Sequence, residues 1–337
     1  MLRAGLIGVG SISKVHRDGY VRCKKEGGPV ELVACCDIRP ECLEAEDFAG
    51  CRKYTSVDEM LKVEVGKLDI IDICVPTFLH SEIAVKAMEA GFNVISEKPM
   101  ARTVEQAQAM IDASERTGKK LMIAYCNRFN ALMDEVVATI KSGELGELCC
   151  AEFWRGGGSR GPMGWENWFR DGDLSGGAVL DLHIHDVDMI QYLFGTPKAV
   201  VALAASNQTK NGYDRVSAQY IYGNGKYAHA YCDWSTAHMK ANTRSYRITF
   251  ENGYIYCDRT PDRKMCIKMD VNGNRTDLTE KMDDVGNMYY NEIKYFAECV
   301  EKNTNPEISM PRDTINSIRM VMAEIESADK DGEKISL

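Results

Sequence analysis

The chain has no excess of basic charge, and this absence is the first property that narrows its function. It carries 41 lysines and arginines against 50 aspartates and glutamates, which gives a net charge of -9. Affinity for a nucleic-acid backbone depends on clustered basic side chains, so the composition predicts no nucleic-acid partner. A small-molecule partner fits this composition better.

The sequence also lacks disulfide-type or metal-type cysteine spacing and long apolar runs. Its 13 cysteines are scattered, several of them inside apolar strand-like runs, and no CxxC pair occurs. This usage predicts reduced thiols and a cytoplasmic protein. No apolar run approaches membrane-spanning length, so no membrane partner is expected. The opening MLRAGLIGVG is interrupted by glycines and lacks a following cleavage site, which favours a first strand over a signal peptide.

The length of 337 residues favours two domains, which we predict at 1–122 and 123–337. Residues 1–122 alternate short apolar runs with amphipathic stretches, the pattern of a parallel α/β sheet of the Rossmann type. Residues 198–270 show alternating runs separated by NG and other turn residues, which predicts antiparallel hairpins in a large open sheet. Because such a sheet leaves a broad face to be covered, we expect a homo-oligomer, either a dimer or a tetramer.

A candidate cofactor site begins directly after the first predicted strand. Gly8, Gly10, Ser11 and Ile12 open a helix, so the backbone can approach a pyrophosphate there, although GxG alone is also common in ordinary turns. Asp37 ends the second predicted strand and can accept hydrogen bonds from the adenosine ribose hydroxyls.

The identity of the cofactor depends on the residues around Asp37. A 2'-phosphate would meet a like charge at this carboxylate, which favours NAD over NADP. Arg39 keeps NADP open, because its guanidinium can stack on adenine or pair with a 2'-phosphate. His80 follows a buried strand, where it can contact the cofactor or simply be satisfied by backbone. The remaining predicted cofactor residues are Ile38, Pro76, Thr77, Glu97, Lys98 and Asn127.

A candidate catalytic group combines Lys98 with the segment GGAVLDLHIHDVD. On an α-helix, the spacing of Asp181, His185 and Asp188 would bring the three side chains to one face. Oxidation of a secondary alcohol needs a base for the hydroxyl proton and a cation for the developing alkoxide. We predict His185 as the base, Lys98 as the cation and Asp181 as the residue that orients the imidazole or the hydroxyl. The alternatives are a surface lysine and a solvated polar helix face.

Two further sets of residues are candidates for ligand binding. The pair His183 and His185 could hold a metal on a strand, but on a helix the two rings diverge by about 200°, so no metal is expected. Aromatic rings and arginines gather around the glycine-rich loop RGGGSRGPMG, and they suit a ring bearing hydroxyls or, alternatively, a core or an interface. The predicted substrate residues of this group are Trp154, Arg155, Trp165, Trp168 and Arg170.

Over nearly its whole length the chain resembles the glucose-fructose oxidoreductase and inositol dehydrogenase family, Gfo/Idh/MocA. The resemblance rests on GVGSIS, Asp37, Pro76 with His80, EKP at 97–99, NRF at 127–129, GELGEL at 143–148, SGGAVLDLHIHDVD at 175–188 and the closing ESADKDGEKISL. It implies an N-terminal Rossmann domain and a C-terminal α+β domain with a large, mostly antiparallel sheet. It also implies Lys98, Asp181 and His185 as the catalytic trio, with Arg128 near substrate or cofactor.

The chain departs from the family pattern at Ser13, at Val75-Pro76-Thr77 and at His183, where glycine is usual, beside the predicted reacting centre. Our leading hypothesis is an NAD(P)-dependent dehydrogenase of a sugar, polyol or inositol-like substrate. Two alternatives stay open: a glycosidase that uses transient oxidation by bound NAD to eliminate the aglycone, and a non-catalytic sugar or nucleotide sensor.

Overall fold

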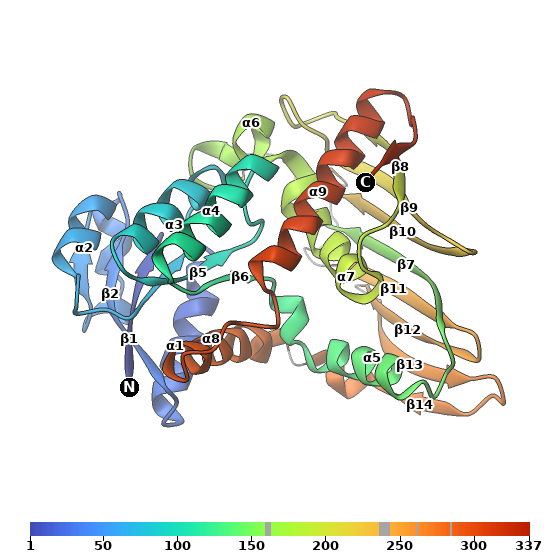
Figure 1. Cartoon of the computed structure of the whole chain (residues 1–337), viewed down its shortest axis with the longest axis horizontal. Coiled ribbons are helices and arrows are strands. Elements are labelled where there is room, and N and C mark those ends of the chain that lie inside the picture. The colour runs from blue at the N-terminus through green and yellow to red at the C-terminus, as the bar shows by residue number, and fades with distance from the viewer. Residues whose placement is uncertain (159–162, 236–242, 261, 284) are drawn as a thin grey trace. The chain divides into compact units, whose positions relative to one another are not determined.

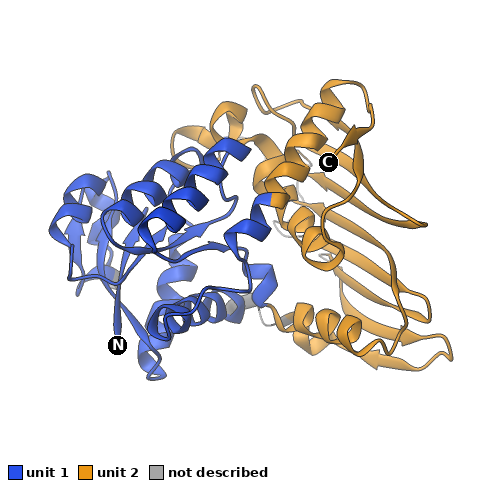
Figure 2. Cartoon of the chain, in the orientation of Figure 1, with its two compact units in different colours: residues 1–129, 285–315 blue, residues 130–284, 316–337 orange. Residues whose placement is uncertain are grey.

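The computed structural model describes residues 1–158, 163–235, 243–260, 262–283 and 285–337, so part of the predicted glycine-rich loop, 159–162, lies outside the described residues. The chain forms two compact units, residues 1–129 with 285–315 and residues 130–284 with 316–337 (Figure 2). The domain boundary after residue 122 stays a prediction. Among the described residues, no helix is both long and apolar enough to cross a membrane.

The first unit is built on a six-stranded parallel sheet of order β3-β2-β1-β4-β5-β6, which confirms the predicted Rossmann-type fold. Its strands are β1 (Leu2–Ile7), β2 (Val30–Cys36), β3 (Arg52–Tyr54), β4 (Ile70–Ile73), β5 (Asn93–Glu97) and β6 (Leu121–Ala124). Its helices are α1 (Ser13–Lys25), α2 (Val57–Val63), α3 (His80–Glu89), α4 (Val104–Thr117) and α8 (Val285–Glu301). Helices α3 and α4 lie on one face of the sheet, and α1 and α8 lie on the other (Figure 1).

Local sequence signals set the ends of these helices. The Thr103 side chain accepts a hydrogen bond from the backbone N–H of Gln106 and so begins α4. Gly118 ends the same helix in a left-handed conformation, with φ of 68°, as the glycine in the sequence predicts. Residues 4–7 of β1 and all of β4 are buried, and all of these residues but Asp72 are uncharged, because helices cover both faces of a parallel sheet.

The second unit contains a nine-stranded sheet of order β14-β13-β12-β11-β7-β10-β9-β8-β15, and its pairing is antiparallel except between β7 and β10. Its strands are β7 (Leu148–Gly156), β8 (Ala199–Ala205), β9 (Arg215–Gly223), β10 (Lys226–Asp233), β11 (Thr243–Phe250), β12 (Gly253–Thr260), β13 (Arg263–Asp270), β14 (Arg275–Asp277) and β15 (Ile335–Ser336). Its helices are α5 (Ala131–Ser142), α6 (Gly172–Ser175), a π-helix (Val179–His183), α7 (Ile184–Phe194) and the larger part of α9 (Pro311–Asp329). The predicted large antiparallel sheet is confirmed.

The two predicted NG hairpins differ in register. Between β9 and β10, Asn224 and Gly225 have φ of 53° and 77°, as a tight two-residue hairpin turn requires. Between β11 and β12, Phe250 pairs with Gly253, so the turn consists of Glu251 and Asn252 and the NG prediction is wrong by one residue. Gly253 belongs to the strand, where a Cβ atom would lie 2.2 Å from a carbonyl oxygen of β13.

Helices pack on one face of this sheet, called the inner face below, and the opposite face is called the outer face (Figure 1). Helix α7 contacts β7 and β10 on the inner face, where small buried residues such as Ala151, Ala218 and Ala230 allow close packing. In the part of the chain that the structure describes, no helix covers the outer face (Figure 1). Side chains of a strand alternate between these faces, which decides where the candidate site residues point.

Candidate active site

The loop after β1 forms a cradle of the kind that a dinucleotide pyrophosphate occupies. Gly8 has φ of 92°, and a Cβ atom there would lie 2.6 Å from the carbonyl oxygen of Cys74, so only glycine fits. At Gly10 a Cβ atom would meet nothing within 4 Å, so the backbone is open to a ligand. Ser13 donates from Oγ to the carbonyl of Gly10 at 2.7 Å and fastens the loop to the start of α1. Ser11 is exposed and Ile12 is half-buried. The loop therefore fits a dinucleotide at a helix N-terminus.

Asp37 follows β2 and is tied to this loop. Its Oδ2 accepts a hydrogen bond from the Val9 N–H at 2.8 Å. Arg39 donates from Nε to Oδ1 and from Nη2 to Oδ2, each at 3.0 Å. Burial alone would raise the pKa of Asp37, but the hydrogen bonds from Arg39 and Val9 lower it, so the carboxylate stays charged. The next side chain, Ile38, is 61% exposed.

His80 connects the loops that follow β4 and β5. Its Nε2 lies 2.9 Å from the carbonyl oxygen of Val75, and its Nδ1 lies 2.8 Å from that of Pro99. The ring is 1% exposed, and burial lowers its pKa. His80 thus has the geometry of the alternative prediction, a histidine satisfied by backbone: it lies between the two loops, and the single N–H of the neutral ring donates to one of the two carbonyls. Pro76 is half-buried and Thr77 is buried beside them.

Beneath Lys98 lies a buried ionic network. Glu97 places Oε1 2.8 Å from His16 Nε2, and its Oε2 accepts a hydrogen bond from the Lys98 N–H at 3.1 Å. His16 Nδ1 lies 2.9 Å from Asp72 Oδ2. Burial opposes a charge on His16, but the Asp72 carboxylate outweighs it and raises the pKa of His16 well above the ordinary value. Glu97 uses its two oxygens to hold His16 and the backbone of half-buried Lys98, and its contact with the cofactor stays a prediction.

No sequence pattern predicted His16, Asp72 and Glu292. His16 and Glu292 lie beside Glu97, and Asp72 lies on the other side of His16. Glu292 of α8 is fully buried, and burial raises its pKa well above the ordinary value. Both His16 nitrogens already face carboxylates, so this cluster is an ion-pair network. No local pattern signals it, because its members come from α1, β4, β5 and α8.

Asn127 and Arg128 follow β6 in a 3-10 turn, Cys126–Phe129, and both are buried. Arg128 donates from Nη1 to Asp313 Oδ2 at 2.6 Å, and its guanidinium lies 5.8 Å from the ring centre of Tyr125. The predicted roles of Asn127 toward the cofactor and of Arg128 toward substrate or cofactor stay predictions.

In the second unit, the predicted single helix over 181–188 is wrong in its first part. Asp181 lies in the π-helix Val179–His183, and α7 begins only at Ile184. Asp181 and His185 are half-buried, whereas Asp188 is fully buried and accepts a hydrogen bond from Ser317 Oγ at 2.9 Å. Single π-helical turns occur most often at functional sites, since they redirect the side chains around them.

The residues predicted to bind substrate separate into two groups. Arg155 is 3% exposed and donates to both carboxylate oxygens of Asp186 on α7, with Nε 2.8 Å from Oδ2. Trp154 points to the opposite face of the sheet, where it stacks on Tyr231 with ring centres 6.4 Å apart. Helix α7, which contains His185, packs on the inner face, so Trp154 lies on the other side of the sheet from His185 and is not part of the proposed substrate site.

The loop before the π-helix carries the other aromatic candidates. Trp165 is 39% exposed, and Trp168 stacks on Phe169 with ring centres 3.9 Å apart. Arg170 is buried and donates from Nη1 to Asp214 Oδ1 at 3.4 Å. The predicted role in substrate binding stays a prediction for Trp165, Trp168 and Arg170. The guanidinium of Arg170 is held by its hydrogen bond to Asp214.

Asp214 organises this part of the second unit. Its carboxylate is fully buried and accepts hydrogen bonds from the Asn207 and Gln208 N–H groups at 2.6 Å and from Trp234 Nε1 at 2.6 Å. Burial alone would raise its pKa, but hydrogen bonds, with that of Thr209 the largest, lower the pKa of Asp214 to about 2.

We predict that Asp214→Asn lowers the free energy of unfolding at pH 7 by about 2 kcal/mol or more, since one pKa unit corresponds to about 1.4 kcal/mol. A carboxyl group whose pKa is lowered in the folded state stabilises the fold at pH values above its ordinary, unfolded-state pKa. This contribution is lost as the pH falls toward the folded-state pKa of about 2. Urea unfolding should therefore show the difference from the parent chain shrinking below about pH 4. Asp58→Asn, at an exposed carboxylate, is the control, and a pH-independent effect of Asp214→Asn contradicts the prediction.

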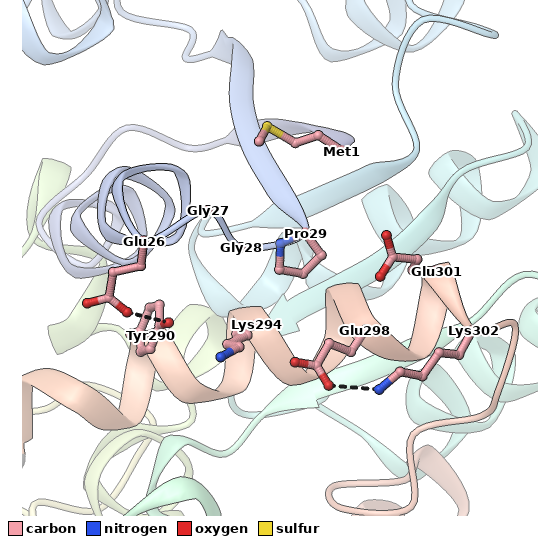
Figure 3. A pocket seen from close by; sticks show the side chains of 10 residues that line it. All are labelled: Met1, Glu26, Gly27, Gly28, Pro29, Tyr290, Lys294, Glu298, Glu301 and Lys302. Carbon is pink, nitrogen blue, oxygen red and sulfur yellow. Dashed lines mark hydrogen bonds and ion pairs between the residues drawn. The ribbon is translucent and has the colours of Figure 1, made fainter.

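A surface pocket of about 580 Å³ in the first unit lies away from these residues (Figure 3). It is lined by Met1 and Pro29, which precede β1 and β2, so it opens at the amino ends of the strands. Its walls include Glu26, which accepts from the Tyr290 hydroxyl at 2.8 Å, and Lys294 (Figure 3). The cofactor candidates all follow the carboxyl ends, where open α/β sheets bind ligands.

Comparison with known proteins places these observations in a family. Residues 2–125 match the family profile described as oxidoreductase family, NAD-binding Rossmann fold, and residues 137–337 match its C-terminal alpha/beta domain. The D-glucoside 3-dehydrogenase of Escherichia coli (strain K12) is 32% identical over 222 residues, covering 65% of this chain and 61% of that protein. The inositol 2-dehydrogenase of Rhizobium meliloti (strain 1021) is 30% identical over 234 residues, covering 67% of each chain.

Solved structures extend the match to the whole fold. A levoglucosan dehydrogenase in complex with NADH and levoglucosan superimposes with a TM-score of 0.87 and 22% identity, covering 100% of this chain and 99% of that chain. At this identity the match describes the fold alone. The sequence alignment with the Escherichia coli relative spans less than two thirds of that relative's length.

Proposed function

The chain belongs to the oxidoreductase family with an NAD-binding Rossmann fold and a C-terminal alpha/beta domain, and from this membership we propose that it is a dehydrogenase of a sugar, polyol or inositol-like substrate. The reaction is transfer of hydride from a secondary hydroxyl carbon to NAD. Relatives named for oxidation of glucosides and inositol support this substrate class.

The observation that carries the proposal is the position of Lys98 in the first unit. Lys98 directly follows β5, at the same carboxyl edge of the sheet as the Gly8–Gly10 loop and Asp37. A cation at the edge where the cofactor binds is suited to stabilise a negative oxygen beside the nicotinamide.

In the proposed mechanism, NAD, when bound, accepts the hydride that leaves the substrate carbon. Lys98 donates a hydrogen bond to the substrate oxygen and stabilises its developing negative charge. His185 takes the hydroxyl proton as the carbon–oxygen double bond forms. Asp181, in the π turn before it, orients the imidazole and favours its protonated form once the proton has moved.

The test is a screen of the purified protein with NAD and a panel containing methyl D-glucosides, levoglucosan and myo-inositol. Absorbance of the reduced nicotinamide should rise with at least one of them. Release of p-nitrophenol from aryl glycosides without added NAD and without net reduction would support the glycosidase alternative instead. Sugar binding without turnover would support the sensor.

We predict that Asp37→Ser shifts cofactor preference toward NADP. The substitution removes the carboxylate that repels a 2'-phosphate and releases Arg39, now paired with Asp37, to bind that phosphate. Charged hydrogen bonds contribute about 1.5–3 kcal/mol, so the ratio of kcat/KM for NADP to that for NAD should rise by about 10²-fold. Glu41→Ser, at an exposed acidic residue nearby, is the matched control. An unchanged ratio in Asp37→Ser contradicts the assignment.

We also propose that the outer face of the nine-stranded sheet is covered by a second copy of the chain. Trp154 and Tyr231 stack there, Leu203 is 61% exposed and Tyr227 is 38% exposed. Large apolar side chains exposed on an uncovered sheet face favour association.

Sedimentation analysis tests this association. The parent chain should sediment as a dimer or tetramer, and Tyr231→Arg at the centre of the face should yield monomers. Val271→Arg, at an exposed hairpin position, should leave the mass unchanged. A monomeric parent chain at all concentrations contradicts the proposal.

A further inference from the structure

A second buried polar network lies directly under the π-helix of the second unit. His183, the last residue of that helix, places Nε2 3.0 Å from Glu324 Oε2 on α9. The Tyr220 hydroxyl of β9 donates to Glu324 Oε1 at 2.6 Å and lies 3.4 Å from His183 Nε2. All three side chains are 0% exposed. His183 therefore does not contact substrate, although it lies two residues from His185 in the sequence.

The protons of this network can be assigned. Burial raises the pKa of Tyr220 well above its ordinary value, and the Glu324 charge raises it further, so the hydroxyl keeps its proton and donates to Glu324. His183 Nδ1 has no hydrogen-bond partner among the described residues, which favours the tautomer with the proton on Nε2, where the Tyr220 hydroxyl oxygen can accept it. The distance between His183 Nε2 and Glu324 Oε2 is that of an ion pair. The N–H does not point at this oxygen, so the two atoms form no hydrogen bond. A buried carboxylate without such neighbours would be costly, so the three groups depend on one another.

The network joins three elements at the point where the π-helix gives way to α7. A π turn is a rare conformation that persists only when surrounding contacts hold it. Tyr220 on the inner face of the sheet and Glu324 on α9 approach His183 from two other elements. A separate hydrogen bond, from Ser317 to Asp188, joins α9 to α7. It lies beyond the π turn and does not involve the residues of the π-helix.

We propose that His183 is a positioning residue: its contact with Glu324 and Tyr220 locks the π turn and thereby sets the orientation of Asp181 and His185. This inference rests on the proposed function, since it assigns those two residues to the reaction. The lock acts on catalysis through backbone geometry alone.

The kinetic test compares His183→Gln with Ser317→Ala, using methyl D-glucoside and myo-inositol as substrates. His183→Gln should lower kcat by about tenfold or more, since small misplacement of a catalytic group costs up to about 10²-fold, while KM for NAD changes by less than about twofold. Ser317→Ala removes the hydrogen bond that joins α9 to α7. It should lower the melting temperature but leave kcat within about twofold. Tyr220→Phe should fall between them. Unchanged kcat in His183→Gln, or an equal fall in both variants, overturns the lock.

Hydrogen exchange separates this inference from the proposed function. Without any sugar, backbone amides over 179–185 should exchange faster in His183→Gln than in the parent chain or in Ser317→Ala. Unchanged exchange overturns the lock even when the parent chain proves to be an active dehydrogenase. Faster exchange in His183→Gln, combined with a parent chain that oxidises no sugar, contradicts the proposed function and removes the catalytic role of the lock.

Discussion

Replacing Lys98 by alanine is expected to lower kcat for alcohol oxidation by about 10³-fold, the usual range for loss of one group that stabilises transition-state charge. Lys98 is half-buried directly after β5, and its N–H is held by Glu97, itself bound to His16. The ammonium is therefore carried on a backbone that a buried ionic network keeps in place. Because the proposed contact forms with the developing alkoxide, KM for the sugar should change far less than kcat.

Two controls accompany this substitution. Binding of NAD to Lys98→Ala, followed by fluorescence, separates the two predicted roles of this residue. An affinity within about threefold of the parent value supports a contact made only in the transition state, whereas a larger loss supports a direct contact with the cofactor. Lys120→Ala removes a buried lysine at the amino end of β6, the opposite edge of the same sheet, and it should retain kcat. Full turnover by Lys98→Ala contradicts the mechanism.

His185→Gln is expected to lower kcat by about 10²-fold to 10⁴-fold, because glutamine has no group that can take the hydroxyl proton. NAD binding should persist, since the dinucleotide residues lie in the first unit and His185 lies in the second. Steady-state kinetics in the direction of alcohol oxidation gives the measurement. Unchanged turnover excludes His185 as the base.

The double variant Lys98→Ala with His185→Gln tests whether the two residues act on one transition state. Groups that work as a unit lose activity together, so the double variant should lose much less than the product of the two single losses. A fully multiplicative loss would mean that the two residues act independently of each other.

The parts of the fold that could be predicted are those that local pattern determines. Strands β1, β2, β4, β5 and β6 coincide with apolar runs because both faces of a parallel sheet are buried. Asn224 and Gly225 revealed their hairpin because both must adopt positive φ. Short β3 was missed, since Arg52 and Lys53 are exposed at the edge of the sheet and carry no apolar signal.

The site was harder to predict because its support comes from distant segments. Asp37 and Gly8 directly follow predicted strands, and these positions in the sequence were enough to predict them as cofactor residues. Glu97 is oriented by His16, 81 positions away in the sequence, and His16 is held in turn by Asp72, 25 positions from Glu97. The π turn around Asp181 was missed as well, because hydropathy periodicity does not distinguish an α turn from a π turn that tertiary contacts hold.

The most direct test of the central claim is to follow hydrogen from substrate to cofactor. Methyl D-glucosides and myo-inositol carrying deuterium at each ring carbon would be incubated with the protein and NAD, and the cofactor would be analysed by mass spectrometry. A net dehydrogenase should yield reduced cofactor carrying one deuterium from a single ring position of a preferred substrate. Cofactor that stays unlabelled and oxidised with every sugar, while Lys98 and His185 are intact, would contradict the account.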